Sequence, residues 1–267
     1  MTESGYPPDL TTPQWELLQP LLPTAKGGAR PPADRRRVFN RRLYLTRAGC
    51  AWRRLPHDFG PWQTMYGYLR NWKRTHHWKI LHDTRRDYVR VEAGQRTQPT
   101  AAMLDSQTVR SADHAGPRGY DGAKKSRGAS DIFWWTPCGG GSGSPRPRWP
   151  SARARAGYWG RRGAGLAGLR CLWADPGYNG PELGRLVSAH RTTGTLRLEV
   201  VPRLQDQRGF VVLATRWIVE RTFGWFMKQR CLVRDYETQP EHAEAMIYVT
   251  MIGIKLRRLA SSPFHDF

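Results

Sequence analysis

The chain has 267 residues, with 43 Lys or Arg against 22 Asp or Glu, so its formal net charge is +21. This length supports one large domain or two smaller ones, and no apolar run approaches the length that spans a membrane. A charge this high favours a polyanionic partner, most simply nucleic acid; the alternatives are a ribosomal-type protein or a merely arginine-rich protein of a GC-rich genome.

The cysteines and the N-terminus bear on the compartment. The four cysteines are widely scattered and form no CxxC pair, which fits neither a zinc site nor a disulfide framework. The first ten residues, MTESGYPPDL, lack the basic and then apolar pattern of a signal peptide. We therefore expect a soluble cytoplasmic protein that is associated with the nucleoid.

The first 90 residues have the pattern of an all-helical unit. One helix is predicted to start near Thr12, a possible cap, and to end at Pro20. A second is predicted after the cap residue Asp34, with Gly49 as its stop, and a third begins near Trp62. Apolar residues at helical spacing give the third helix one buried face. That face consists of Trp62, Met65, Tyr66, Leu69 and Trp72.

Basic residues of this unit lie where DNA contacts are expected. Residues 26–37 read as a flexible basic arm of a kind that lies along phosphates or in a minor groove. A helix, an irregular turn and a helix with basic outer residues are typical of a helix-turn-helix reader, although a small helical bundle with solvated basic residues is the alternative. The predicted DNA-binding residues are Arg35, Arg36, Arg37, Arg70, Lys73 and Arg74, together with Lys124 and Lys125.

Three carboxylates occur in contexts that suit metal ions. Asp105 lies at the polar end of a short apolar strand, and Asp175 directly follows another. Glu220 lies in a helical segment where Arg216, four residues earlier, shares its face. Carboxylates at neighbouring strand ends, joined by one from a packing helix, hold two Mg²⁺ ions that clamp the oxygens of a phosphodiester; taken singly, each is better read as an ordinary turn or surface residue. The residues expected to anchor this helix in the core are Trp217, Ile218 and Trp225.

These residues and their order resemble bacterial insertion-sequence transposases of the DDE type, in the group related to insertion sequence 5. The N-terminal block begins with LTTPQWELLQPLLP, and the carboxylate blocks are LDSQTVRSADHAGPRGYDGAKK, LWADPGYNG and GFVVLATRWIVERTFGWF. The last segment, RDYETQPEHAEAMIYVTMIGIKLRRLA, is similar to the group's final helices. The resemblance covers roughly residues 8–127 and 169–260. Two positions depart from the pattern: Met227, where a lysine often stands, and Pro176, where glycine is usual.

The resemblance implies a reaction and its residues. It makes Asp105, Asp175 and Glu220 the catalytic residues and the ligands of Mg²⁺, for which Mn²⁺ substitutes. The implied reaction is cut-and-paste DNA transposition, in which a water and then a freed 3′-hydroxyl attack phosphorus in line. Arg216 would orient Glu220 or contact a phosphate. The implied partners are double-stranded DNA, as the element's terminal inverted repeats and as target, and further copies of the chain in a homo-oligomer on DNA, with no membrane partner.

The implied fold class is α/β. An RNase H-like catalytic domain, residues 101–267, follows an all-α helix-turn-helix-like DNA-binding domain, residues 1–90. A linker, residues 91–100, joins the two. Within the catalytic domain, residues 129–168 do not fit this architecture.

The segment SDIFWWTPC, residues 130–138, stands where the group has a basic run and then a hydrophobic strand. If Ser130 has an AGY codon, reading one base earlier forces Leu-Val-Asp and permits Lys-Arg-His-Ile-Leu-Val-Asp-Thr-Leu. Of the 30 residues from Gly139 to Gly168, 26 are Gly, Ala, Pro, Arg or Ser, as expected of GC-rich DNA read out of frame. We therefore interpret 129–168 as a frameshifted segment whose frame is restored before Leu169; a genuine flexible insertion is the alternative.

A frameshift would have a structural consequence. Gly/Pro-rich sequence is expected to be disordered and to supply no central strand, so the middle strands would be disrupted and Asp105 would lose a strand partner. A metal site displaced by about 1 Å loses on the order of a hundredfold in rate. The sequence thus leaves open an active or inactive DNA transposase, a non-catalytic DNA-binding remnant on the terminal repeats, and a stand-alone nuclease without end specificity.

Overall fold

The computed structural model describes residues 5–23, 34–110, 112, 119–121, 126–136, 140–145, 168–174, 196–201 and 214–261. The helices are α1 (Thr12–Leu18), α2 (Arg35–Ala48), α3 (Trp62–Arg74), α4 (His77–Glu92), α7 (Ala214–Met227), α8 (Arg230–Val233) and α9 (Pro240–Ala260). The strands are β1 (Ala101–Arg110), β2 (Gly119–Asp121), β3 (Ser126–Thr136), β4 (Gly140–Pro145), β5 (Cys171–Ala174) and β6 (Arg197–Val200). Among these residues, no helix has the length and apolar character to cross a membrane.

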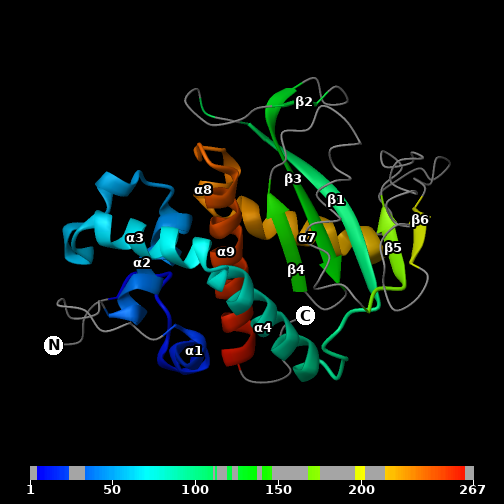
Figure 1. Ribbon diagram of the computed structural model, residues 1–267, viewed down its shortest axis with the longest axis horizontal. Coiled ribbons are helices and arrows are strands. Elements are labelled where there is room, and N and C mark those ends of the chain that lie inside the picture. Colours follow the sequence, from blue (N-terminus) through cyan, green and yellow to red (C-terminus); the bar gives the residue numbers. More distant parts are fainter. Residues whose placement is uncertain are drawn as a thin grey trace.

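A helical part and a sheet lie side by side, and α9 runs between them (Figure 1). The α/β class expected from the sequence is confirmed at this level, with a helical N-terminal region and a mixed sheet.

Local cap signals set the ends of the first two helices. Thr11, and not the predicted Thr12, caps α1: its hydroxyl accepts a hydrogen bond from the Gln14 amide, and the Gln14 side chain accepts one from the Thr11 amide. Asp34 caps α2 as predicted: its carboxylate accepts hydrogen bonds from two backbone amides in the first turn of the helix. Gly49 ends α2 in the left-handed conformation, with φ at 67°, which confirms the predicted stop.

Replacing Gly49 tests how α2 ends. A Cβ at this position would lie 2.6 Å from the Cβ of Arg230, so Gly49→Ala combines backbone strain with a clash. Gly94 is the matched control, because its φ is also 67° and a Cβ there meets nothing within 4 Å. We expect Gly94→Ala to cost about 1–2 kcal/mol of unfolding free energy and Gly49→Ala at least about 1 kcal/mol more. Equal losses in urea unfolding would show that the Arg230 contact is unimportant.

The connection between α2 and α3 is the irregular turn expected from the sequence, and it is longer than the turn of a standard helix-turn-helix unit. Thirteen residues, 49–61, join the two helices and include two short 3-10 turns, Trp52–Arg54 and His57–Phe59. A helix-turn-helix unit uses a turn of about 3–4 residues. Prolines and glycines in this stretch interrupt helix formation, so the chain makes a longer path. The tight turn lies instead between α3 and α4, where His76 adopts a left-handed conformation with φ at 56°.

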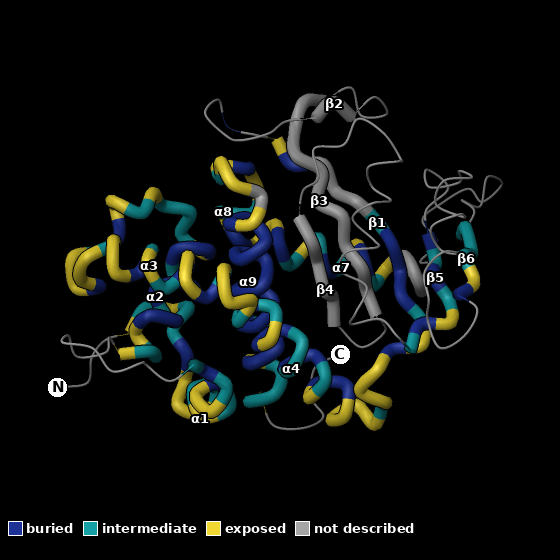
Figure 2. The backbone as a smooth tube through the Cα atoms, in the orientation of Figure 1, coloured by how far each residue is buried: buried dark blue, intermediate teal, exposed yellow. Residues whose placement is uncertain are grey.

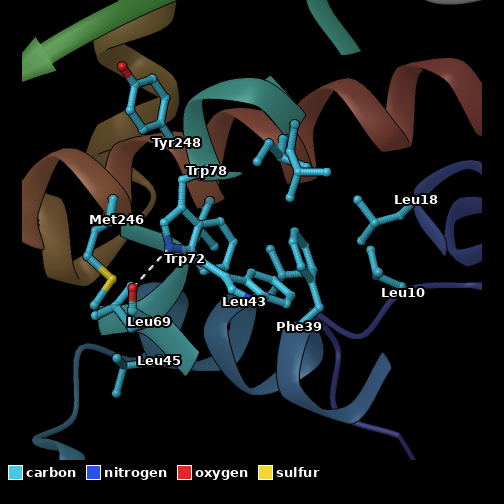
Figure 3. Packing of buried hydrophobic residues seen from close by; sticks show 14 of the residues in the cluster. Leu10, Leu18, Phe39, Leu43, Leu45, Leu69, Trp72, Trp78, Met246 and Tyr248 are labelled. Carbon is cyan, nitrogen blue, oxygen red and sulfur yellow. Dashed lines mark hydrogen bonds between the residues drawn. The ribbon is translucent and has the colours of Figure 1, made fainter. Parts of the chain in front are cut away.

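A single apolar core joins the four N-terminal helices to α9. Trp72 and Trp78 pack with their ring centroids 4.9 Å apart, and the Trp78 indole donates to the Leu69 carbonyl at 3.4 Å (Figure 3). Phe39 of α2 adds a third ring, 6.0 Å from Trp78. Helix α9 is buried along most of its length, as Figure 2 shows. Its residues in this core are Ala245, Met246, Tyr248, Val249, Ile252 and Leu256.

The sheet combines parallel and antiparallel strands. Its order is β2-β3-β1-β5-β6, and β4 pairs with the other part of β3. Strand β1 runs parallel to β5, which runs parallel to β6, whereas β3 is antiparallel to β1 and to β4. Strand β1 is therefore central, with neighbours on both edges.

Strand β3 corrects the expectation that Asp105 lacks a strand partner. It pairs with β1 over eight positions, and Asp105 lies opposite Phe133. Backbone hydrogen bonding does not depend on side-chain identity, and the run of Ile, Phe and two Trp at 132–135 favours a strand. Strand β4 belongs to the same segment, 129–168, of which residues 137–139 and 146–167 lie outside the described residues.

The two faces of β1 carry different side chains. Ala102 and Leu104 pack with residues of β5 in one apolar cluster. Met103 points to the opposite face, where it packs with Val219 and Phe226 of α7 and with α9 residues. Side chains alternate along a strand, so Asp105 projects to the same face as Met103, which is the face that α7 covers.

Candidate active site and nucleic-acid contacts

Asp105 lies at the centre of the sheet, beside the helix that carries Glu220. Its side chain is half-buried, two residues beyond Met103, which packs in one cluster with Val219 of α7. Residues two apart on a strand share a face, so Asp105 lies on the face of β1 that packs against α7. The fold therefore packs β1, which carries Asp105, against α7, which carries Glu220.

Asp175 lies outside the described residues, but the residue before it is described. Ala174 ends β5 and pairs with Leu104, the residue before Asp105. Trp173 packs on the α7 side of the sheet, as Met103 does. Leu104 and Ala174, the residues that precede the two predicted aspartates, therefore pair with each other across adjacent parallel strands.

Glu220 is exposed on α7, at the margin of that helix's buried face. The buried residues Val219 and Phe226 anchor α7 on the sheet. Arg216 is also in α7, one turn before Glu220, as predicted; its side chain lies outside the described residues. Helix α7 therefore presents Glu220 to solvent while its apolar face fixes its position.

The exposed side of α7 differs from the prediction that Trp217 anchors the core. Trp217 is 45% exposed, whereas Ile218 packs partly into the core as predicted. The Arg221 guanidinium lies 4.5 Å from the Trp217 ring centroid and 4.9 Å from that of Trp225. These three residues are four apart, so the spacing already indicated a shared face. The stripe they form adjoins Glu220 and orders this surface of the helix.

The predicted basic arm ends in arginines that bind protein carbonyls. Arg35 donates to the Leu22 and Pro23 carbonyls, each at 3.3 Å, and Arg36 donates to the Leu10 carbonyl at 2.8 Å. Arg37 donates to the Asp58 carbonyl. The three guanidinium groups therefore connect α2 to neighbouring segments, a role that local sequence did not indicate because each partner is at least twelve residues away.

The other predicted DNA contacts differ among themselves. Arg70 and Arg74 are exposed on α3, and Arg74 donates to a near neighbour, the Asn71 side chain, at 3.3 Å. Lys73 reaches the Gln239 side chain at 3.1 Å, just before α9. Both lysines of the remaining pair, Lys124 and Lys125, lie outside the described residues. Arg70 and Arg74 are thus the best placed of the set to contact a ligand on the surface.

Other arginines of α2 serve the core. Arg42 is fully buried; it donates to the Met65 carbonyl and its guanidinium lies 4.2 Å from the Trp52 ring centroid. Burial lowers the pKa of Arg42 well below its usual value. Part of the positive charge of the chain therefore stabilises the helical part and is not displayed to a partner.

Divalent-cation chemistry fits the donors that are described. Asp105 and Glu220 offer carboxylate oxygens, the ligand type that Mg²⁺ prefers. Among the described residues, no group of three His, Cys, Asp or Glu side chains forms a metal site. Asp175, the third predicted ligand, is outside this set.

Two family models match the chain in separate segments. Residues 10–82 match the family described as "Putative transposase of IS4/5 family", and residues 172–257 match "Transposase DDE domain", an RNase H-like domain. A curated relative, the insertion element IS402 uncharacterized 16.2 kDa protein of Burkholderia cepacia, is 28% identical over 103 residues. The match covers 36% of this chain and 69% of the relative. No solved structure matches the chain.

The matched segments correspond to the two parts of the fold. The first covers the helices α1 to α3 and the start of α4, and the second runs from β5 through α7 to α9. Their order along the chain is the order expected from the sequence blocks, and both matched families are transposases, so the resemblance to insertion-sequence transposases is confirmed.

Proposed function

We propose that this chain catalyses metal-dependent DNA strand cleavage and transfer of an insertion element, with Asp105, Asp175 and Glu220 as the metal ligands. One observation carries the proposal: the face of β1 that bears Asp105 packs on α7 next to Glu220, and Leu104 pairs with the residue before Asp175. Carboxylates that follow adjacent parallel strands and meet a packed helix are suited to two divalent cations.

In this reaction the bound metal would stabilise charge, and the residues of the chain would hold the metal ligands in position. Bound Mg²⁺, or Mn²⁺ in its place, would neutralise charge on the phosphate and activate the attacking oxygen. Asp105 is fixed by strands on both sides, so its carboxylate is held without a flexible backbone. Glu220 is fixed through the buried side of α7. Arg216, one turn earlier, is proposed to orient Glu220 or to contact a phosphate oxygen.

We propose that double-stranded DNA binds across the helical part and the edge of the sheet near Glu220. Arg70 and Arg74 supply exposed positive charge on α3, and the net charge of +21 supports attraction to phosphates. The substrates would be the terminal inverted repeats of the element and a target duplex. Copies of the chain would assemble on the two ends, where the protein acts on the DNA of the nucleoid.

The test is Mg²⁺-dependent cleavage of duplexes that carry the ends of the element, with unrelated duplexes of equal length beside them. End-specific cleavage followed by joining to a target supports the transposase. Cleavage of both duplexes without joining supports a stand-alone nuclease. Specific binding without cleavage supports the second candidate, a non-catalytic remnant, which the composition of residues 139–168 favours.

We also propose that residues 129–168 arise from a frameshift. The forced Leu-Val-Asp in the alternative frame and the narrow composition of residues 139–168 support it. A strand at Ser126–Thr136 is compatible with the proposal, because both readings of 133–135 give apolar residues. Resequencing codons 127–169 decides: codons for SDIFWWTPC that do not regroup as Lys-Arg-His-Ile-Leu-Val-Asp-Thr-Leu reject the frameshift.

A further inference from the structure

A cavity lies where α2, α9 and the turn after α7 meet. Its volume is about 100 Å³, which is room for several water-sized groups. Two arginines line it, Arg47 from α2 and Arg257 from α9. The polar side chains Thr250 and Gln229 line it as well, and two prolines of the N-terminal segment form another part of the wall. No acidic side chain is among the described residues that line it.

The two guanidinium groups make the cavity electropositive. Arg47 donates one hydrogen bond to the Lys228 carbonyl at 3.1 Å, which holds it near the end of α7. Burial and then the charge of Arg47 lower the pKa of Arg257, so the two cations repel each other across the site. Within the described residues, neither arginine forms an ion pair. Like charges held together in this way are relieved by an anion between them.

Thr250 provides an independent sign of a missing ligand. Its side chain is 2% exposed, it lines the cavity, and its hydroxyl has no hydrogen-bond partner among the described residues. A threonine inside a helix usually bonds back to the preceding turn. A buried hydroxyl without a partner costs about 1–3 kcal/mol, so a ligand oxygen would satisfy an existing need.

We propose that this cavity binds a phosphate group of the DNA backbone, held by Arg47, Arg257 and the Thr250 hydroxyl. Guanidinium groups match phosphate geometry, and the hydroxyl donates to a third oxygen. The inference rests on the proposed function for the choice of DNA over a free anion. The cavity lies between α2 of the helical part and the turn that follows α7, so a phosphate here would hold the duplex close to the end of the helix that carries Glu220.

The salt dependence of DNA binding tests the proposal. Binding of full-length protein to a 20-bp duplex of unrelated sequence would be measured at several salt concentrations. Each neutralised phosphate contributes about 0.9 to the slope of log K against log salt. Arg257→Gln and Arg47→Gln should each reduce the slope by about 1 and weaken binding several-fold. Arg96→Gln is the control: it removes the same charge from an exposed residue in the loop before β1, and it should leave the slope unchanged. Equal slopes for Arg257→Gln and Arg96→Gln overturn the proposal.

Thr250→Val gives a second readout that does not change the charge. It removes a buried hydroxyl that has no partner, so the unliganded variant should fold at least as stably as the original chain. We expect DNA binding to weaken several-fold despite this; unchanged binding overturns the role of the hydroxyl and hence the site.

Inorganic phosphate distinguishes the source of the ligand. A rise in melting temperature with phosphate that disappears in Arg257→Gln, together with an unchanged DNA slope, would assign the cavity to a free anion and reject a DNA contact. Failure of the original chain to bind any duplex would instead reject the proposed function. The two failures are therefore separable.

Discussion

Asp105→Asn is expected to lower Mg²⁺-dependent cleavage by on the order of a hundredfold or more, while DNA binding and thermal stability stay nearly unchanged. The change keeps the size of the side chain but removes its negative charge. Asp105 is central in the sheet, so a shift elsewhere cannot easily bring a replacement carboxylate to the same place. The measurement is the single-turnover cleavage rate on a duplex that carries an element end.

Glu220→Gln should have a similar effect, because it removes the charge that α7 presents. Glu92→Gln is the matched control: this glutamate is also exposed, at the end of α4, and is far from α7 in the chain. Near-normal cleavage by Asp105→Asn would contradict the metal-ligand role. An original chain that binds element ends and cuts none of them would favour the DNA-binding remnant.

Short-range signals were the part of the fold that the sequence predicted well. Asp34 and Gly49 bound α2 as predicted, since a cap acts through hydrogen bonds within one turn. Trp62 begins α3 as predicted, and Met65 and Leu69 of its apolar face are buried. Such features depend on spacing within a few residues, and spacing is visible in a sequence.

Long-range pairing was the part that the sequence did not reveal. Arg36 reads as a DNA contact when only its charge is known, but the carbonyl it binds, that of Leu10, comes from a distant segment. Strand β3 was missed because a Gly- and Pro-rich context outweighed four strand-favouring residues at 132–135. The cavity residues Arg47 and Arg257 are 210 positions apart, and no local pattern relates them.

Helix α9 shows the same limit at the level of domains. The proposed boundary at residue 101 assigns α9 to the catalytic part. In the structure, Met246 and Ile252 pack in the core of the N-terminal helices, whereas Ile247 and Met251 pack on the sheet side with Met103. One helix therefore serves two cores through opposite faces, and its amphipathic pattern is masked because both faces are apolar.

A fragment of residues 1–100 is accordingly expected not to fold alone. Removing α9 takes Met246, Val249, Ile252 and Leu256 from its core, a loss of about 6–12 kcal/mol at about 1.5–3 kcal/mol for each buried side chain. That loss equals most or all of the stability of a typical domain, about 5–15 kcal/mol. Thermal melting followed by circular dichroism and tryptophan fluorescence should show no cooperative transition, and Trp72 and Trp78 should be solvent-exposed. The full-length chain carrying Asp105→Asn is the control and should melt cooperatively, and a cooperative transition in the fragment would contradict the joint core and support an independent domain at residues 1–90.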